Sequence, residues 1–297
     1  MKETVLLTGA TGFLGSYLAK RLLCEGYKVI ILKRSFSDIW RIKDILNDLI
    51  YYNIDEFSIE QPFKEHKKID IVIHTATCYG RNSENVSKIV ETNLLFPLRL
   101  IENAVLFNTD TFFNTDTLQY KYLNTYTLSK KQFVEWIKIF SKKIQIVNLK
   151  IEHMYGPKDD KSKFVTWLIS EFLNNRCEIK LTKGEQKRDF IYIDDVVNAY
   201  IKILENREKL SSYEEFDVGT GKQIKIKDFV ILTKQTVSSI LNREVKTRLN
   251  FGALPYREGE FMEIKENIKP LLDLGWHPEV ELEEGIKRTI IWEVKKL

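Results

Sequence analysis

The fold is decided by a stretch near the start of the chain, Val5-Leu6-Leu7-Thr8-Gly9-Ala10-Thr11-Gly12-Phe13-Leu14-Gly15. Its apolar first half suits a buried strand of a parallel sheet. Apolar residues then recur at helical spacing toward Gly26, at Phe13, Leu14, Leu18, Leu22 and Leu23. Three glycines separate the strand from the helix, where a backbone without side chains lets a pyrophosphate approach the amino end of the helix. The stretch therefore predicts a phosphate-binding turn over Gly12 to Leu14, with a plain strand-to-helix turn as the alternative.

A second β-rich run, 27–32, ends in Lys33-Arg34-Ser35. In a dinucleotide-binding unit, an acidic residue about 20 positions past the glycines receives the ribose hydroxyls of NAD, whereas basic groups there accommodate the 2′-phosphate of NADP. Lys33 stands where the acid would be. The pattern therefore favours NADP, unless Lys33 and Arg34 are only the solvated end of a strand.

Composition narrows the class of protein. The chain has 297 residues, 43% of them hydrophobic, which is enough for one large lobe or two smaller ones. Lys and Arg number 46 against 42 Asp and Glu, spread along the chain without a basic block, so a nucleic-acid partner is not expected. The three cysteines, Cys24, Cys78 and Cys177, are far apart and lack metal-ligand spacing. With no signal peptide or membrane-length apolar run, we expect a reduced, cytoplasmic protein without a metal or a membrane partner.

The region between residues 38 and 101 predicts further α/β elements. It holds a helix-like stretch at 38–47, a weak strand at 50–54 whose Ile54 could border an adenine, a clear strand at 69–74 and a long helix outlined by Ile89 to Ile101. His74, at the end of the clear strand, is interpreted as a packed residue rather than a catalyst. Tyr79 and Arg81 follow the same strand end, the side on which ligands bind in such sheets, and are candidate substrate contacts.

A fifth strand, 111–114, leads to Thr115-Asp116-Thr117 and then to Tyr126-Thr127-Leu128-Ser129-Lys130. Four residues make about one helical turn, so Tyr126 and Lys130 share a face. A nearby ammonium group lowers the pKa of a tyrosine from its usual value of about 10. The pair therefore predicts a tyrosine that acts as a general acid or base.

Together these residues resemble the extended short-chain dehydrogenases that act on nucleotide sugars, the NAD-dependent epimerase/dehydratase family. The resemblance rests on Thr8 to Gly15, on Thr115 and on Tyr126 with Lys130. It continues in Met154-Tyr155-Gly156-Pro157, in the run from Lys183 to Val196 and in Phe216-Asp217-Val218-Gly219-Thr220-Gly221, so it covers essentially the whole chain.

The resemblance implies an α/β fold, a Rossmann-type doubly wound parallel sheet with a smaller C-terminal substrate-binding lobe. Residues 1–157 would form the NADP-binding domain, with 189–204 returning to it, and residues 158–188 and 205–297 would form the nucleotide-sugar lobe. It also implies a homodimer formed through the long helices that contain Ile101 and Phe133.

The resemblance assigns roles to individual residues. The catalytic residues would be Thr115, Tyr126 and Lys130. The cofactor NADP(H) would be bound by Gly9, Thr11, Gly12, Phe13, Leu14, Gly15, Lys33, Arg34, Ile54, Thr75, Ala76, Thr77, Asn93, Tyr126 and Lys130. The substrate, a nucleotide-diphosphate sugar, would be bound by Tyr79, Arg81, Asp116, Thr117, His153, Arg188 and Arg257, of which the two arginines would hold phosphates unless they are plain surface residues. Asp116 is left open between a contact to a sugar hydroxyl and a solvated turn residue.

Two departures from the family pattern narrow the reaction. Relatives often carry an asparagine where this chain has Glu152-His153, so His153 would inherit that contact or serve a new one. Dehydratases of this family typically carry Thr-Asp-Glu after the fifth strand, and enzymes that epimerise before reducing carry a cysteine in place of the glutamate. This chain has Thr117 at that position, which supplies neither a carboxylate nor a thiol. Dehydration and epimerisation before reduction are therefore both disfavoured.

The sequence in the middle of the chain most resembles that of the synthases that reduce CDP-4-keto-3,6-dideoxyhexoses to abequose or paratose. The reductases that form dTDP-fucose are close neighbours of these synthases. The resemblance therefore implies an NADPH-dependent 4-ketoreductase acting on an NDP-4-keto-6-deoxy or 3,6-dideoxy-hexose in surface-polysaccharide sugar biosynthesis. The alternatives are an NDP-sugar 4-epimerase and a catalytically idle NADP(H)-binding sensor.

Overall fold

The computed structural model describes residues 3–296, which divide into two compact units. The first unit comprises the chain up to Ile151 and a returning segment, Val197–Asp217. The second comprises Glu152–Val196 and the chain from Val218 onward. The chain therefore crosses between the units three times.

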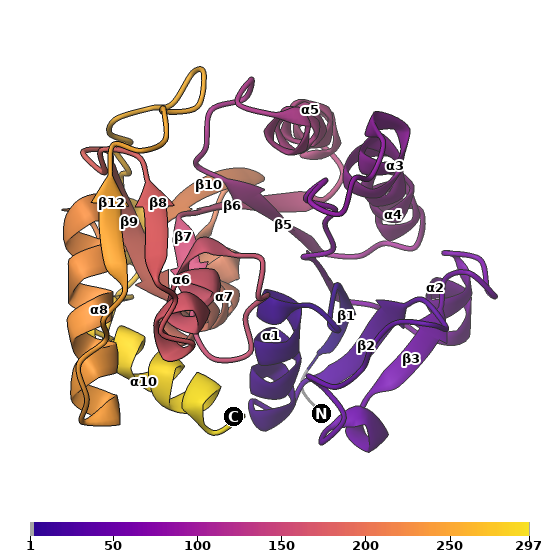
Figure 1. The fold of residues 1–297 in the computed structure, drawn as a ribbon. Helices are drawn as coiled ribbons and strands as arrows, with labels where there is room; N and C mark the ends of the chain where they lie inside the picture. The colour runs from indigo at the N-terminus through magenta and orange to yellow at the C-terminus, as the bar shows by residue number, and fades with distance from the viewer. Residues whose placement is uncertain (1–2, 297) are drawn as a thin grey trace. The chain divides into compact units, whose positions relative to one another are not determined.

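The first unit is built on a seven-stranded sheet with the strand order β10-β6-β5-β4-β1-β2-β3 (Figure 1). Its strands are β1 (Thr4–Thr8), β2 (Lys28–Lys33), β3 (Ile50–Asn53), β4 (Ile71–His74), β5 (Thr111–Thr117), β6 (Gln145–Ile151) and β10 (Tyr213–Val218). The strands β1 to β6 pair in parallel, and Leu6 on β1 lies beside Ile30 of β2 and Val72 of β4. The predicted doubly wound parallel sheet is confirmed.

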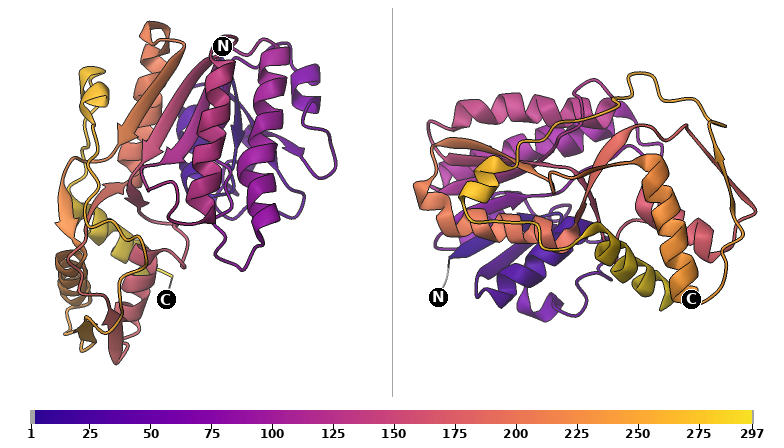
Figure 2. Two further views of the ribbon diagram at one scale, coloured as in Figure 1. Left: turned by 90° about the horizontal axis from the view of Figure 1, so that it is seen from above. Right: turned by 90° about the vertical axis from the view of Figure 1, so that its left-hand side faces the viewer.

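Helices cover both faces of this sheet. They are α1 (Phe13–Cys24), α2 (Gln61–Glu65), α3 (Val86–Val90), α4 (Phe96–Leu106), α5 (Thr125–Phe140) and α7 (Ile193–Asn206), with short 3₁₀ turns η1 (Leu46–Asp48) and η3 (Arg207–Lys209) and a π-helical turn η2 (Glu91–Leu95). Figure 2 shows α4 and α5 side by side. A core under these two helices joins Leu6 and Phe112 of the sheet to Ile101 and Phe133, all fully buried.

The direction of chain progress reverses beside β1. From β1 the chain adds β2 and β3 on one side and then returns to add β4 on the other. Ligands of open α/β sheets bind at the carboxyl ends of the strands where this reversal occurs. The fold therefore places the glycine turn after β1, and Thr75 after β4, at the expected binding edge.

The predicted helix at 38–47 is wrong. The segment forms a succession of tight turns in which the N–H of Ile42 donates to Ile39 and the N–H of Ile45 donates to Ile42, followed by η1. These bonds span three residues rather than four, the 3₁₀ pattern. Of the three isoleucines only Ile42 is fully buried, so the segment lacks the broad apolar face that stabilises an α-helix.

The fifth strand is longer than predicted. Thr115, Asp116 and Thr117, expected as a turn after the strand, lie within β5 and pair with Leu149, Lys150 and Ile151 of β6. Successive side chains of a strand point to opposite faces of the sheet. Thr115 and Asp116 therefore face different layers of the unit.

The second unit contains two small sheets and four helices among its described residues. The sheets have the orders β11-β9-β7 and β12-β8. The strands are β7 (His153–Tyr155), β8 (Glu178–Leu181), β9 (Lys187–Tyr192), β11 (Gln223–Lys225) and β12 (Arg248–Phe251), and the helices are α6 (Phe164–Leu173), α8 (Ile226–Leu241), α9 (Lys269–Asp273) and α10 (Leu282–Val294). Stacked rings of Phe190 and Phe229, 4.0 Å apart, join the larger sheet to α8.

The boundaries of the units differ from the predicted ones in three places. Residues 152–157, predicted in the cofactor domain, belong to the second unit because β7 pairs with β9. Residues 205–217, predicted in the smaller lobe, belong to the first unit because they include most of β10, which adds to the edge of the sheet beside β6. Residues 189–196, predicted to return to the cofactor domain, belong to the second unit because β9 pairs with β7 and β11.

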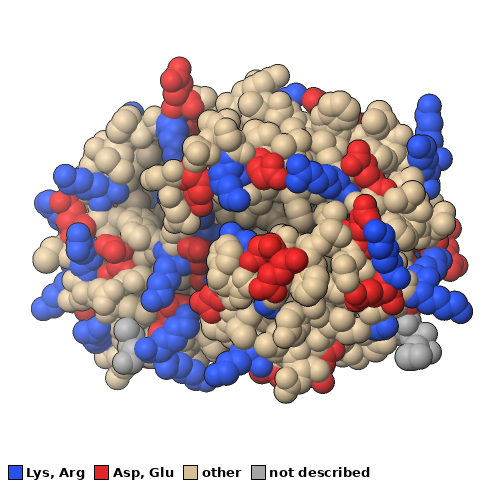
Figure 3. Space-filling model, turned by 90° about the vertical axis from the view of Figure 1, so that its right-hand side faces the viewer, with Lys and Arg blue, Asp and Glu red and all other residues tan. Residues whose placement is uncertain are grey.

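None of the described helices is long and apolar enough to cross a membrane. On the face shown in Figure 3, basic and acidic side chains are interspersed rather than gathered by sign.

Candidate active site

The glycine turn packs tightly against the loop after β4. Gly9 has a φ of +74°, and a Cβ there would lie 2.6 Å from the hydroxyl of Thr75 and 2.7 Å from the N–H of Ala76. A Cβ on Gly15 would lie 2.1 Å from the Gly9 carbonyl oxygen. Two of the three glycines are therefore required by the packing of the chain on itself, and this packing fixes the position of the turn.

Helix α1 begins directly after this turn. Its N-cap is Gly12, and within the described residues no side chain caps this end of the helix. The N–H of Gly12 donates to the Gly9 carbonyl at 2.9 Å, which closes the turn ahead of the helix. An uncapped helix start preceded by a tight glycine turn suits an anion, because first-turn N–H groups and the positive end of the helix dipole point toward it.

The strands β1 and β4 are tied together where the chain reverses. The Thr8 hydroxyl lies 2.8 Å from Nδ1 of His74, and the Thr75 hydroxyl donates to the Thr8 carbonyl at 2.7 Å. His74 is fully buried beside the rings of Phe96, Phe112 and Phe133, and burial lowers its pKa well below the usual value. The interpretation of His74 as a packed residue is confirmed, since a neutral ring that holds two strands has no exposed surface for a substrate.

The predicted NADP determinants lie at the ends of β2 and β3. Lys33 Nζ donates to Asn53 Oδ1 at 2.6 Å and lies 4.8 Å from the centre of the Tyr51 ring. Beyond it, the N–H and hydroxyl of Ser35 donate to Asp55 at 2.8 and 2.5 Å. This carboxylate, the acid nearest to the strand ends in sequence, is therefore already bonded, and its hydrogen bonds to Ser35 lower its pKa.

A cation that sequence reasoning missed, Arg41, also reaches the glycine turn. Its Nη1 lies 3.5 Å from the carbonyl oxygen of Thr11, and its guanidinium lies 4.5 Å from the centre of the Trp40 ring. Arg34 lies in the same way over Phe36. The strand-end lysine is therefore accompanied by two arginines that adjacent aromatic rings support.

Asn93 supports the loop after β4 rather than offering a free polar group. Its Oδ1 accepts hydrogen bonds from the N–H of Cys78 at 2.7 Å and the hydroxyl of Thr77 at 3.3 Å. Its Nδ2 donates to the Cys78 carbonyl and to the hydroxyl of Ser129. Because Asn93 is fully buried and its amide is bonded on all sides, it fixes the loop relative to α5.

Tyr126 and Lys130 lie one turn apart in α5, as predicted. The helix starts with a reciprocal cap, in which Asn124 accepts from the N–H of Thr127 and the Thr127 hydroxyl accepts from the N–H of Asn124. This cap fixes the first turn, which carries Tyr126. The structure also brings both candidate substrate contacts beside it, because the Tyr79 ring lies 4.9 Å from the Tyr126 ring and the Arg81 guanidinium lies 4.7 Å from the Tyr79 ring.

The expected lowering of the Tyr126 pKa is wrong, because burial outweighs the nearby positive charge. Burial raises the pKa of Tyr126 well above its usual value, Tyr79 and Asp116 raise this pKa further, and Arg81 lowers it. Burial also lowers the pKa of Lys130 to about 8, partly offset by Asp116. Tyr126 is therefore a protonated phenol in this state, and Lys130 is a cation that is easily neutralised.

Thr115 and Asp116 have separate buried partners. The Thr115 hydroxyl lies 2.6 Å from that of Tyr200, a fully buried residue of α7. The Asp116 carboxylate bonds to Lys131 Nζ at 2.7 Å through Oδ2, while its Oδ1 is buried without a partner among the described residues. Asp116 is only 3% exposed, so the alternative of a solvated turn residue is wrong. Thr117 is buried beside it, and its hydroxyl accepts from the N–H of Gln119.

In the second unit, His153 is held by an acid. Its Nδ1 lies 2.9 Å from Oε2 of Glu152, a nearly buried carboxylate, and its ring lies against Phe190. The neighbouring Asp189 accepts hydrogen bonds from the hydroxyl of Thr220 and from two backbone N–H groups that follow β10. Burial raises the pKa of Asp189 to about 7, and Glu152 contributes to this rise.

The two arginines predicted to hold phosphates differ in environment. Arg188, on β9, forms an ion pair with Glu260, and both side chains are largely buried. Arg257 is exposed and lies three residues before Glu260, on the loop between β12 and α9. The two arginines are thus linked through one loop, but Arg188 is bonded to a carboxylate.

Comparisons with known proteins agree with this architecture. Residues 5–219 match the model of the NAD dependent epimerase/dehydratase family. The chain belongs to this family. It is 38% identical over 301 residues to the CDP-abequose synthase of Salmonella muenchen, covering 98% of each chain, and 28% identical to a dTDP-4-dehydro-6-deoxyglucose reductase of Escherichia coli, covering 97% of each. Its fold matches that of a UDP-glucose 4-epimerase of Thermotoga maritima with a TM-score of 0.83 and 23% identity, over 99% of each chain.

Family membership makes the chain an enzyme of the epimerase/dehydratase type, and the candidate site residues of the two units fall into two groups. One group was visible in the sequence as local patterns, such as the glycine turn and the Tyr126 and Lys130 pair. The other group was missed, namely Arg41, Lys131, Tyr200 and Glu260. Only Lys131 had a local signal, because it directly follows Lys130.

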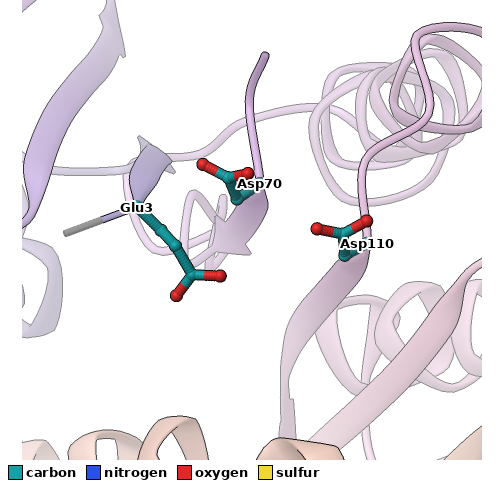
Figure 4. Close-up of side chains that lie close together, drawn as sticks. All are labelled: Glu3, Asp70 and Asp110. Atoms are coloured by element: carbon teal, nitrogen blue, oxygen red, sulfur yellow. The ribbon is translucent and has the colours of Figure 1, made fainter. Parts of the chain in front are cut away.

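The opposite edge of the same sheet carries an acidic cluster of Glu3, Asp70 and Asp110 (Figure 4). Lys68 Nζ lies 2.6 Å from Asp110 and 3.4 Å from Asp70, and Arg207 pairs with Glu3. The N–H of Thr4 also donates to Asp70 at 2.7 Å. Two cations therefore already balance these carboxylates, at the edge of the sheet remote from the glycine turn.

Proposed function

We propose that this family member is an NADPH-dependent 4-ketoreductase that acts on an NDP-4-keto-6-deoxy or 3,6-dideoxy-hexose. The observation that carries the proposal is the geometry at the start of α5, where Tyr126 and Lys130 lie one turn apart beside Tyr79 and Arg81. A reductase must give a proton to the oxygen that becomes a hydroxyl, and the Tyr126 phenol is placed to give it. The 38% identity to a CDP-abequose synthase over nearly the full length of both chains supports the same class of substrate.

The residues at the binding edge fit a dinucleotide. The turn that Gly9 and Gly15 hold in place would receive the pyrophosphate at the start of α1, and Lys33 with Arg34 and Arg41 would receive the 2′-phosphate. Lys130 would donate to hydroxyls of the nicotinamide ribose. When bound, NADPH supplies the hydride that reduces C4 of the sugar.

The chain's own residues then handle the oxygen at C4. Tyr126 donates its phenolic proton to this oxygen as negative charge develops on it, and Thr115 donates a hydrogen bond to the same oxygen. Lys130, a cation one turn along α5, stabilises the tyrosinate left behind until a proton returns from solvent. The net change is the conversion of a ketone into an alcohol.

The substrate-binding residues remain proposals of the same kind. Tyr79, Arg81 and Asp116 would contact the sugar, and of these Tyr79 and Arg81 lie beside Tyr126. In the second unit, Arg188 and Arg257 would bind the diphosphate, and His153 would contact the nucleotide sugar. Thr117, buried in β5, offers neither the carboxylate of a dehydratase nor the thiol of an epimerising reductase.

The same residues would also allow a 4-epimerase, and one assay separates the two functions. Purified protein is mixed with a panel of CDP- and dTDP-linked 4-keto-6-deoxy and 4-keto-3,6-dideoxy sugars, and NADPH absorbance and sugar products are followed. We expect stoichiometric oxidation of NADPH with at least one 4-keto sugar. Interconversion of NDP-hexoses without added reductant would instead identify an epimerase, and NADPH binding without turnover across the panel would identify a sensor.

We also propose a homodimer formed through α4 and α5. Ile101 and Phe133 lie in the core, but the same helices expose the apolar side chains of Leu106, Trp136 and Ile139. A second copy of the chain would cover them. Light scattering should give twice the mass of the chain, and the Trp136→Asp/Ile139→Asp double variant should be monomeric. A monomeric wild-type protein would contradict the proposal.

A further inference from the structure

Thr115 has a neighbour to which no role has been assigned. The hydroxyl of Tyr200, on α7, lies 2.6 Å from the Thr115 hydroxyl. Within residues 3–296, Thr115 is the one hydrogen-bond partner that the structure gives to the Tyr200 hydroxyl, and Tyr200 has no exposed surface. Thr115 itself is partly exposed at the carboxyl end of the sheet.

The proton between the two oxygens belongs to Tyr200. If Thr115 donated to Tyr200, the phenolic proton would be buried without an acceptor, which carries a desolvation penalty. If Tyr200 donates to Thr115, the phenol is satisfied and the Thr115 proton turns toward the exposed side. A phenol is also the stronger donor of the two hydroxyls, and burial raises the pKa of Tyr200, which keeps its proton in place.

Packing holds the phenol in this position. The Tyr200 ring lies 6.3 Å from the ring of Phe113, which is on the same face of β5 as Thr115. Both rings are fully buried, so the phenol has little freedom to turn away. The direction of the hydrogen bond is therefore built into the contact between β5 and α7.

We propose that Tyr200 is a positioning residue that donates its hydrogen bond to Thr115 and thereby directs the Thr115 proton at the C4 oxygen of the sugar. Donation into the threonine oxygen also polarises the threonine, which makes its own proton a better hydrogen-bond donor. This inference rests on the proposed 4-keto reduction. It adds Tyr200 to the residues that stabilise charge on the oxygen, through Thr115 and without contact to the substrate.

The test removes each hydroxyl singly and both together. Tyr200→Phe keeps the ring and should lower kcat about 3- to 10-fold with KM unchanged, whereas Thr115→Val should lower kcat about 100-fold because it removes the direct donor. In the Thr115→Val background, Tyr200→Phe should have no further effect on kcat, since there is no threonine proton left to direct. Tyr213→Phe is the matched control, because it removes another hydrogen-bonded phenol of the first unit, whose partner is Glu215.

Three outcomes would overturn the inference in an active enzyme. They are a kcat of Tyr200→Phe equal to that of the wild type, a rise in KM alone, and an equal loss of kcat from Tyr200→Phe with or without the Thr115 hydroxyl. Melting temperatures of all variants identify a loss of folding, which would lower the active fraction and not the kcat per active site. A wild-type protein that reduces no 4-keto sugar would instead refute the proposed function, and the catalytic role of Tyr200 with it. A double-mutant cycle of urea unfolding then still decides whether Tyr200 and Thr115 are coupled.

Discussion

Two regions of the molecule differ in how their side chains are held. One is the catalytic edge of the first unit, formed by Thr115, Asp116, Tyr126, Lys130 and Lys131. The other is the arginine loop of the second unit, residues 252–268. At the catalytic edge, secondary structure carries every side chain, and Tyr200 and Lys131 fix Thr115 and Asp116 from behind. On the arginine loop, Glu260 forms an ion pair with Arg188 of β9, and Arg257 is exposed. The groups proposed to act on the reacting atoms are thus arranged before a ligand arrives, whereas Arg188, a proposed phosphate ligand, must exchange a protein carboxylate for the substrate.

This difference explains why the two regions should respond differently to substitution. A change at the catalytic edge should alter the rate of the chemical step or the stability of the fold, because Asp116 and Lys130 are buried and Thr115 and Asp116 have fixed hydrogen-bond partners. A change on the arginine loop should alter affinity and leave the rate of the step almost unchanged, because the proposed role of its groups is to bind the part of the substrate that does not react.

The largest effect is expected from Tyr126→Phe. Loss of the phenolic proton should lower kcat about 10²- to 10⁴-fold, while NADPH affinity changes little. Tyr213→Phe is the matched control, because it removes a hydrogen-bonded phenol of the first unit that has no part in the proposed reaction. Steady-state reduction of the preferred 4-keto sugar measures both variants. Turnover of Tyr126→Phe near the wild-type rate would remove Tyr126 as the acid.

The next effect is on stability, from Lys131→Met. This change leaves the Asp116 carboxylate buried, with neither oxygen bonded to a cation. Loss of one member of such a pair should lower the free energy of unfolding by about 3 kcal/mol. Urea unfolding measures the change, and Asp116→Asn in the Lys131→Met background should recover part of it.

Lys121→Met is the control for this experiment, because the pair between Lys121 and Glu135 is far more exposed. Its loss should change the free energy of unfolding by no more than about 1 kcal/mol. Equal effects of the two substitutions would mean that the ion pair at the catalytic edge contributes no more to stability than an exposed pair does.

Cofactor preference should change with Lys33→Asp. The new carboxylate would repel the 2′-phosphate and accept ribose hydroxyls, so the dissociation constant for NADPH should rise about 10- to 100-fold while NADH binding is kept or improved. Lys28→Asp is the control, because Lys28 lies at the opposite end of the same strand. Unchanged NADPH affinity in Lys33→Asp, measured by fluorescence titration, would contradict the proposed cofactor preference.

Much of the first unit could be predicted from the sequence because its signals are local. The glycine turn, the strands and the Tyr126 and Lys130 spacing each lie within a few residues, and the structure places them as expected. One exception is the segment 38–47. Its isoleucines recur every three residues, a spacing that fits both 3₁₀ turns and one face of an α-helix. The spacing alone therefore did not distinguish the two structures.

The partners that complete the site could not be predicted, because they come from remote parts of the chain. Tyr200 lies 85 positions from Thr115, and Glu260 lies 72 positions from Arg188. Neither has a local pattern that marks it. The direction of the Tyr126 pKa shift was missed for a related reason, since the charge of Lys130 is visible in the sequence whereas burial against Tyr79 depends on the fold.

The smallest effect should come from Glu260→Gln on the arginine loop. An anion that binds Arg188 must displace the Glu260 carboxylate and tolerate its charge nearby, and the substitution removes the charge while keeping the shape of the side chain. The dissociation constant for the free nucleoside diphosphate should therefore fall about 3- to 10-fold, with kcat unchanged. Glu258→Gln, an exposed position on the same loop, controls for the change of net charge alone and should alter affinity by less than about 2-fold. Calorimetric titration with CDP and dTDP gives both values. Weaker binding in Glu260→Gln would show that Glu260 orients Arg188 toward the diphosphate rather than competing with it, and the contrast between a prearranged catalytic edge and an exchanging arginine loop would then be lost.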